Sequence, residues 1–302
     1  MKRILITGAG GLIGKRLTEM LLQKGYEVNV LGRSKPKPAS QNVKSFVWNI
    51  DTGEMETAAF AGVSAIVHLA GAGIAQQRWN DERKREIIDS RVKSATLIYN
   101  FLKKNKHNVT TFISASAVGY YGNCGEELIA EEHQAGSDFL AEVCKQWEQS
   151  AMQFSKIGLR EVRCRIGIVL AKNGGALPEL TKTMPVGMAG YFAKPDLYYP
   201  WIHIDDVCGI VIHALENENM KGAYNTCAPE PLLMKNLMQE IVKAKKSHAL
   251  LLPVPPLGIK LALGEMSAML LSSQRCCSEK ISMSGYKFKY SQIEKALKAI
   301  YG

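Results

Sequence analysis

Three glycines near the N-terminus have the spacing of a phosphate-binding loop. They belong to the stretch TGAGGLIG at residues 7–14, which joins an apolar run of strand length to a segment with helical spacing of apolar residues. Gly8 would permit a tight turn, Gly11 would let a pyrophosphate approach the backbone, and Gly14 would allow helix and strand to pack closely. The helix N-terminus would add unpaired N–H groups and a favourable dipole. The loop therefore predicts a dinucleotide site that also includes Thr7, Leu12 and Ile13.

The residues after the second strand-like run bear on which dinucleotide binds. An NAD site usually carries an acid there, which holds the ribose 2′-hydroxyl. This chain instead has LGRS at 31–34, with Lys35 and Lys37 beyond. Arg33 could pair with a 2′-phosphate while Ser34 donates beside it. The sequence therefore predicts NADP(H), the alternative being a basic turn that is merely solvated.

Alternating strand-like and helix-like segments surround this loop and would hold it in place. Apolar runs typical of strands occupy residues 2–7, 27–31, 43–48, 65–70, 111–116 and 161–170, and helical spacing occurs at 11–24, 81–105 and 138–156. Strands that alternate with helices indicate a parallel sheet covered on both faces, and right-handed crossovers favour a doubly wound order. The predicted fold class is α/β, a Rossmann-type doubly wound parallel sheet with a smaller mixed C-terminal lobe.

The alternation becomes irregular after residue 170, which suggests how the chain divides. Residues 1–170 are predicted to form an NADP(H)-binding Rossmann domain, to which residues 201–228 return with a compact strand and helix pattern. Residues 171–302 would form a substrate-side lobe. Within it, residues 250–302 are expected to be a small unit with helices near 257–271 and 291–300.

Composition and charge are those of an ordinary globular protein with an excess of base. The hydrophobic fraction is 46%, the charged fraction is 22%, and the formal net charge is +10. A polyanionic partner, a phosphate-rich cofactor or a basic surface that only aids solubility would each account for this charge. The basic residues are scattered, and the densest runs, 103–106 and 243–246, fall at expected helix ends, which favours the last explanation.

Cysteine usage and the apolar segments indicate a cytoplasmic protein with no metal site. The seven cysteines, including the adjacent Cys276 and Cys277, lack metal-ligand spacing and fit reduced thiols. No signal peptide is evident, because a strand-like run begins at residue 4. Three prolines interrupt the apolar stretch at 250–263, so no membrane helix is expected.

Four segments together resemble one large family. Besides TGAGGLIG, these are AIVHLAGA at 65–72, FISASAVGYYG at 112–122 and WIHIDDV at 201–207. They are similar to motifs of the extended short-chain dehydrogenase/reductase superfamily, in its NAD(P)-dependent epimerase/dehydratase group. The resemblance implies that the end of the fourth strand, which carries Leu69, Ala70 and Gly71, passes beside the cofactor.

Further stretches resemble an atypical branch of that group, the YfcH-like epimerase-family proteins. They include RW at 78–79, SR at 90–91, FLAEVC at 139–144, RIGIVL at 165–170, GEM at 264–266 and the segment 285–290. The tail resembles the branch's C-terminal domain of unknown function. The resemblance covers nearly the whole chain and implies a Rossmann lobe, a smaller C-terminal lobe and a cleft between them.

The family's acid–base pair is missing from the expected helix. Active members use a Ser or Thr on the fifth strand together with Tyr-x-x-x-Lys on the next helix, where a depressed tyrosine pKa allows proton exchange during hydride transfer. Ser116 can supply the hydroxyl. The helix near residue 138 contains no tyrosine, and it places Leu140 and Cys144 where Tyr and Lys are expected. The Tyr-x-x-x-Lys at Tyr99 lies on the preceding helix, and we interpret it as chance.

Other residues are candidates for the missing role. Tyr121, with its neighbour Tyr120, is the first acid–base candidate, and Cys144 and His133 follow. Each has a structural alternative, since a helical cysteine is usually a small buried hydrophobe and a tyrosine beside a glycine can be an aromatic plug. For three further polar residues a structural role is favoured, namely hydrogen bonding in a strand for His203 and helix N-capping for Asp205 and Asp206.

Three basic residues could bind substrate. Lys84 and Arg91 are two helical turns apart on one face, and with Arg78 they could line the cleft mouth and attract an anionic substrate. A solvated basic face is the alternative.

Three hypotheses about function stay open. The first is an atypical NADP(H)-dependent oxidoreductase or epimerase that acts on a small, anionic or sugar-like molecule near Ser116. The second is an NADP(H)-binding regulator or sensor without turnover. The third, a nucleic-acid-binding protein, is the least favoured, because basic and aromatic residues do not interleave at stacking spacing. A monomer and a homodimer are both compatible with the sequence.

Overall fold

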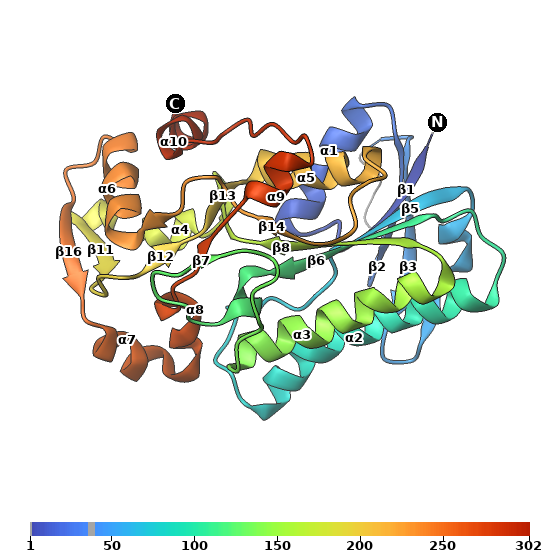
Figure 1. The fold of residues 1–302 in the computed structure, drawn as a ribbon, viewed down its shortest axis with the longest axis horizontal. Helices are drawn as coiled ribbons and strands as arrows, with labels where there is room; N and C mark the ends of the chain where they lie inside the picture. Colours follow the sequence, from blue (N-terminus) through green and yellow to red (C-terminus); the bar gives the residue numbers. More distant parts are fainter. Residues whose placement is uncertain (1, 36–39) are drawn as a thin grey trace.

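A parallel sheet forms the centre of the N-terminal lobe (Figure 1). The computed structural model describes residues 2–35 and 40–302. The eight strands run in the order β14-β8-β6-β5-β1-β2-β3-β4, and only the β3–β4 pairing is antiparallel. This order confirms the predicted Rossmann-type doubly wound sheet. The strands are β1 (Arg3–Thr7), β2 (Glu27–Gly32), β3 (Val43–Asn49), β4 (Glu54–Met55), β5 (Val63–His68), β6 (Thr111–Ala117), β8 (Arg160–Ile166) and β14 (Gly222–Thr226).

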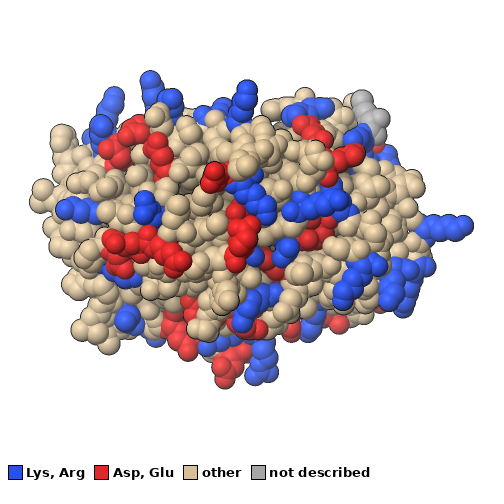
Figure 2. Space-filling view, viewed as in Figure 1, with Lys and Arg blue, Asp and Glu red and all other residues tan. Residues whose placement is uncertain are grey.

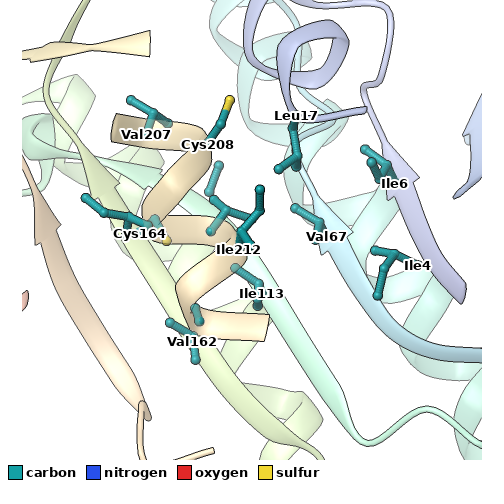
Figure 3. Close-up of a cluster of buried hydrophobic side chains, with 14 of the residues drawn as sticks. Ile4, Ile6, Leu17, Val67, Ile113, Val162, Cys164, Val207, Cys208 and Ile212 are labelled. Atoms are coloured by element: carbon teal, nitrogen blue, oxygen red, sulfur yellow. The ribbon is translucent and has the colours of Figure 1, made fainter. Parts of the chain in front are cut away.

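Two layers of helices cover the sheet. On one face lie α1 (Leu12–Gln23) and α5 (Ile204–Glu216), and on the other lie α2 (Asp81–Lys104) and α3 (Phe139–Met152) (Figure 1). Side chains of a strand alternate between faces, so Ile4 and Ile6 pack under α1 and α5 while Leu5 packs under α2. Figure 3 shows the first of these cores, where Leu17 of α1 and Ile212 of α5 meet the strands. Each face of the sheet therefore has its own apolar core beneath its pair of helices.

One predicted strand is two strands in different sheets. The apolar run at 161–170 breaks at Gly167, after which β9 (Ile168–Ala171) joins a second sheet with β13 (Trp201–His203) and β10 (Gly174–Gly175). A side chain at Gly167 would collide with the carbonyl group of Pro200. Glycine is therefore required where the chain leaves the main sheet, and the apolar pattern alone gave no sign of the change.

The C-terminal lobe has its own core. Its strands β11 (Met188–Phe192) and β16 (Leu250–Val254) pair in parallel and pack with α6 (Met234–Ala244) and α10 (Ile293–Tyr301) around a separate apolar cluster. The single helix predicted near 257–271 is wrong: Gly264, with φ of +58°, separates α7 (Pro256–Leu263) from the next helical turns. The remaining short elements are β7 (Leu128–Ile129), α4 (Leu177–Leu180), β12 (Tyr198–Tyr199), β15 (Leu232–Leu233), α8 (Ala268–Leu271), β17 (Arg275–Cys276) and α9 (Glu279–Met283). In the part of the chain described, no helix combines the length and apolarity needed to cross a membrane.

A buried carboxylate joins the C-terminal tail to the first lobe. Asp206, fully buried in the first turn of α5, accepts hydrogen bonds from the Tyr286 hydroxyl at 2.8 Å, the Lys289 N–H at 2.8 Å and the Tyr290 N–H at 2.9 Å. The N-cap predicted at Asp205 and Asp206 is wrong, because the His203 side chain caps α5 by accepting from the Asp205 N–H. Both carboxylates instead lie near the positive end of the helix dipole.

We expect Asp206→Ala to destabilise the protein by about 3 kcal/mol, because it leaves three donors without their buried acceptor. Urea unfolding measures this loss. Glu216→Ala removes an exposed carboxylate paired with Lys24 and should cost less than about 0.5 kcal/mol. Equal stabilities of the two variants would contradict the anchoring role of Asp206.

Candidate functional site

The glycine loop lies where β1 ends and α1 begins. Gly8 has φ of +71°, and a Cβ there would lie 2.7 Å from the carbonyl carbon of Leu69, the residue that follows β5. A Cβ on Gly14 would overlap the Gly8 carbonyl oxygen and Ala9, so this glycine permits close packing of helix against loop. Gly11 has only that carbonyl oxygen nearby, at 3.3 Å from a Cβ. The loop is therefore tight on its inner side and open beside Gly11.

The start of α1 has no anionic group of its own. Its N-cap is Gly11, no side chain caps it, and its first turn, with Leu12 and Ile13, holds no acidic residue. The first N–H groups of a helix have no partners within the helix and carry a partial positive charge. This end of α1 therefore has the donors and the field that suit a phosphate group.

Thr7 has a structural task in the loop. Its hydroxyl lies 2.8 Å from His68 Nδ1 and accepts from the Ala70 N–H, which ties the ends of β1 and β5 together. The other ring nitrogen of His68 contacts Ser94 on α2. Burial lowers the pKa of His68 to about 4, so its ring is neutral near pH 7. The Thr7 hydroxyl is therefore engaged within the loop, and the predicted cofactor role of Thr7 stays a prediction.

Arg33 and Ser34 lie exposed just beyond the carboxyl end of β2. Among the residues described, neither has a hydrogen bond or ion pair, whereas the neighbouring Lys35 pairs with Glu56. Lys37 lies outside the described residues. Arg33 is thus a free guanidinium at the edge where a doubly wound sheet binds its ligands.

Ser116 and Tyr121 are held in a buried polar network rather than exposed to a cofactor. The Ser116 hydroxyl donates to Glu148 Oε1 at 2.8 Å, and Glu148 also accepts from Arg163 and Arg165. The Tyr121 hydroxyl donates to Asn225 at 2.6 Å and accepts from Arg165 at 2.8 Å. Burial is the main influence on the pKa of Tyr121 and raises it. This geometry does not support the predicted catalytic roles of these two residues.

Cys144 is also unsuited to proton transfer. It is buried on α3, and burial raises the pKa of its thiol to about 12. Leu140, one turn earlier, lines a cavity, and both side chains lie against Gly119 after β6. The positions expected for the family's tyrosine and lysine therefore hold an apolar side chain and a protonated thiol.

Two further acid–base candidates lie away from the cavity. His133 contacts Cys124 and Glu127, with a distance of 3.5 Å between its Nδ1 and the carboxylate of Glu127. Tyr120 stacks under the Arg165 guanidinium, whose carbon is 3.6 Å from the ring centroid. Neither residue lines the cavity.

The cavity, of about 390 Å³, lies between the N-terminal ends of α2 and α3 and the C-terminal lobe. Figure 1 shows α7 and α8 beside these helix ends. Leu140 forms part of its wall. Its titratable side chains are Lys84, Asp138, Lys260 and Glu265. The C-terminal lobe therefore supplies half of the groups that could meet a substrate.

The three predicted substrate residues do not form one cluster. Lys84 pairs with Glu265, and Arg78 donates to the Ala262 carbonyl group, so both contact the C-terminal lobe, but only Lys84 lines the cavity. Arg91 is buried instead, under Gly71 and over the Trp147 ring. The prediction that Arg91 lines the exposed cleft mouth is therefore wrong, because its guanidinium points into the protein.

The charged surface is mixed. Figure 2 shows Lys and Arg interspersed with Asp and Glu on the face in view. The basic runs predicted to end helices do so, with Lys103 and Lys104 in the last turn of α2 and Lys243 in that of α6. Among the residues described, no group of three or more His, Cys, Asp and Glu side chains could hold a metal ion.

Comparisons with known proteins agree over the whole chain. Residues 4–142 match the NAD dependent epimerase/dehydratase family, and residues 254–300 match a domain of unknown function, DUF1731. The chain is 34% identical to the chloroplastic epimerase family protein SDR39U1 homolog of Arabidopsis thaliana, covering 98% of this chain and 86% of that protein. It is 31% identical to the epimerase family protein YfhF of Bacillus subtilis, covering 97% and 96% respectively.

Solved structures show the same fold. The human epimerase family protein SDR39U1, solved with NADPH, superposes with a TM-score of 0.85 at 27% identity, covering 99% of both chains. A UDP-glucose 4-epimerase from Thermus thermophilus, solved with NAD, has a TM-score of 0.79 at 18% identity and covers 99% of this chain and 97% of its own. The second likeness concerns the fold alone.

We expect Cys144 to react with iodoacetamide at pH 8 at least about a hundredfold more slowly than the half-buried Cys277, because it is a buried thiol and not a thiolate. Mass spectrometry of tryptic peptides over time measures both rates. In guanidinium chloride the two rates should become similar. Comparable rates in the folded protein would restore Cys144 as an acid–base or nucleophilic candidate.

Proposed function

The chain belongs to the NAD dependent epimerase/dehydratase family, and we propose that it is an NADP(H)-dependent oxidoreductase for a small anionic molecule. The cofactor would bind across the carboxyl ends of β1, β2 and β5. The substrate would occupy the cavity beneath the C-terminal lobe. The observation that carries the proposal is the combination of an uncapped α1 behind the glycine loop with a free Arg33 at the end of β2.

The residues present fit a dinucleotide phosphate. Gly8 and Gly14 keep the loop free of side chains, and the N–H groups at the start of α1 would hold the pyrophosphate. Arg33 and Ser34 would hold a 2′-phosphate, since a guanidinium fork matches phosphate geometry. The NADPH in the human SDR39U1 structure supports this choice. A structure that shares the fold is solved with NAD, so the fold alone does not set the preference, and we assign the preference to Arg33.

We assign the cavity to a small anion beside the nicotinamide because it offers two cations, Lys84 and Lys260, although Asp138 and Glu265 balance them in number. Bound NADP(H) would supply the hydride, while Lys84 and Lys260 would attract and orient the negative group of the substrate. Glu265 pairs with Lys84 in the structure and would be displaced by that group. Leu140 would exclude water from one wall. With no tyrosine on α3, the proton would come from another cavity group. Of the two cavity acids, Asp138 is the nearer to Leu140 in sequence, and its carboxylate also caps α3 by accepting from the Ala141 N–H.

A second candidate, cofactor binding without turnover, is favoured by one specific observation. Ser116 and Tyr121 are committed to a buried network, and Cys144 is a buried thiol. A regulator or sensor would need none of these groups to exchange a proton. The third hypothesis, nucleic-acid binding, gains no support from the mixed charges of the face in Figure 2.

We expect the wild-type protein to bind NADPH at least about tenfold more tightly than NADH, and Arg33→Ala to abolish this preference by weakening NADPH alone. Isothermal titration calorimetry of cofactor-stripped protein measures both affinities. Lys24→Ala, which removes a cation paired with Glu216, is the matched control and should leave both unchanged. Tighter binding of NADH, or a preference that survives Arg33→Ala, would refute the assignment of the 2′-phosphate to Arg33.

Turnover distinguishes the two candidates. We expect the wild-type protein to oxidise NADPH with some member of a panel of carboxylate-bearing carbonyl compounds and nucleotide sugars. Lys84→Ala should raise the KM for that substrate about tenfold while it retains the affinity for NADPH. Lys145→Ala, which removes a half-buried partner of Glu142, should keep the wild-type KM. If NADPH binds but no member of the panel is reduced, the protein is the non-catalytic binder.

A further inference from the structure

Arg91 on α2 is a buried cation without a counter-ion. Its side chain donates to the Ile87 carbonyl group at 2.8 Å and to the Ala72 carbonyl group at 3.1 Å. The residue is only 8% exposed, and its Nε–H has no partner. Among the residues described, no carboxylate forms an ion pair with Arg91. The two carbonyl groups orient the guanidinium but leave its charge uncompensated.

Other buried arginines in this chain are paired. Arg165 contacts Glu148, and Arg83, two turns before Arg91 on the same helix, contacts Glu86. A buried guanidinium without an anion is unfavourable, because it loses its hydration without gaining an attractive charge. Burial accordingly lowers the pKa of Arg91 to about 10, and at pH 7 the group still carries its charge.

The Arg91 guanidinium lies beside the carboxyl end of β5, where the dinucleotide is proposed to bind. Gly71 follows β5, and a Cβ on it would lie 2.9 Å from the guanidinium carbon of Arg91, so the guanidinium lies directly against this glycine. The guanidinium stacks on Trp147 at 4.8 Å and is close enough to Cys144 to influence the pKa of its thiol. Cys144 occupies the position expected for the family's lysine, and the adjacent Lys145 pairs with Glu142, so the cation that lies against Cys144 is Arg91 of α2.

The nearby acids do not offset this charge. Glu148, the acid one turn beyond Cys144 on α3, already binds Arg163 and Arg165. The family's tyrosine, whose ionised form would add a negative charge beside a lysine, is replaced here by Leu140. The field at this end of β5 is therefore positive, and the low polarity of the surroundings screens it weakly.

We propose that Arg91 makes the dinucleotide site selective for NADPH over NADP⁺, an inference that rests on the proposed cofactor. The two forms carry the same phosphates and differ in the nicotinamide, which is positively charged when oxidised and neutral when reduced. A fixed cation at the carboxyl end of β5 repels the oxidised ring and not the reduced one. NADPH therefore loads readily and NADP⁺ leaves readily, which suits a reductase and equally a sensor of the reduced cofactor.

Calorimetric titration of the full-length, cofactor-stripped protein with NADPH and with NADP⁺ tests the inference. We expect NADPH to bind at least about tenfold more tightly, which corresponds to about 1.4 kcal/mol. Equal affinities, or tighter binding of NADP⁺, would overturn the inference and leave the proposed cofactor intact. If neither nucleotide binds, the proposed function fails and the inference fails with it.

Charge variants separate the electrostatic role of Arg91 from a structural one. Arg91→Gln should tighten NADP⁺ binding and bring the affinity ratio close to one, while Arg91→Lys should retain the wild-type ratio. Lys93→Gln, which removes an exposed cation paired with Asp89 on the same helix, should also retain it. Thermal melts verify that each variant is folded. An unchanged ratio of NADPH to NADP⁺ affinity in folded Arg91→Gln would refute the role of Arg91. If that variant does not fold, the affinity ratio of the wild-type protein tests the inference, and equal affinities would overturn it.

Discussion

The buried carboxylate of Glu148 organises the polar interior of the N-terminal lobe, where α3 packs on β6 and β8. It binds Arg163 and Arg165 of β8 and the Ser116 hydroxyl of β6, and Arg165 continues the network to Tyr121. Removing one member of such a pair leaves a charge buried without compensation, which costs about 3–5 kcal/mol. The network therefore fixes α3 on the sheet. It also fixes the orientation of every polar side chain that the family's chemistry would otherwise use.

This constraint explains how the site differs from an ordinary dehydrogenase. Ser116 and Tyr121 serve as structural members of the network, and α3 presents Leu140 to the cavity. Charge reaches the site from other elements instead: the N-terminus of α1 attracts phosphate, and α2 contributes Lys84 at the cavity and Arg91 below β5's exit. Groups suited to binding anions are thus present, although Leu140 and Cys144 stand where the proton-transfer pair is expected.

The C-terminal lobe is part of the site because of specific polar contacts. Asp206 holds the segment from Tyr286 to Tyr290 on α5, and Glu265 meets Lys84 across the cavity. Sequence patterns could predict the doubly wound sheet, because strand and helix periodicities are local properties. They could not predict the break at Gly167 or the capping of α5 by His203, since both depend on segments distant in sequence or on a side-chain rotamer.

The sequence by itself determined the glycine loop, the position of Arg33 after the second strand, and the presence of Leu140 and Cys144 where the family's tyrosine and lysine are expected, since each follows from residue types at fixed spacing. Only the tertiary structure decided which polar groups are free to act. Ser116 was a catalytic candidate and Arg91 a substrate-binding candidate from the sequence, yet the first is bound to a buried acid and the second is buried with no paired acid among the described residues. The physical reason is that desolvation and charge pairing depend on neighbours brought together by folding, which spacing along the chain does not encode.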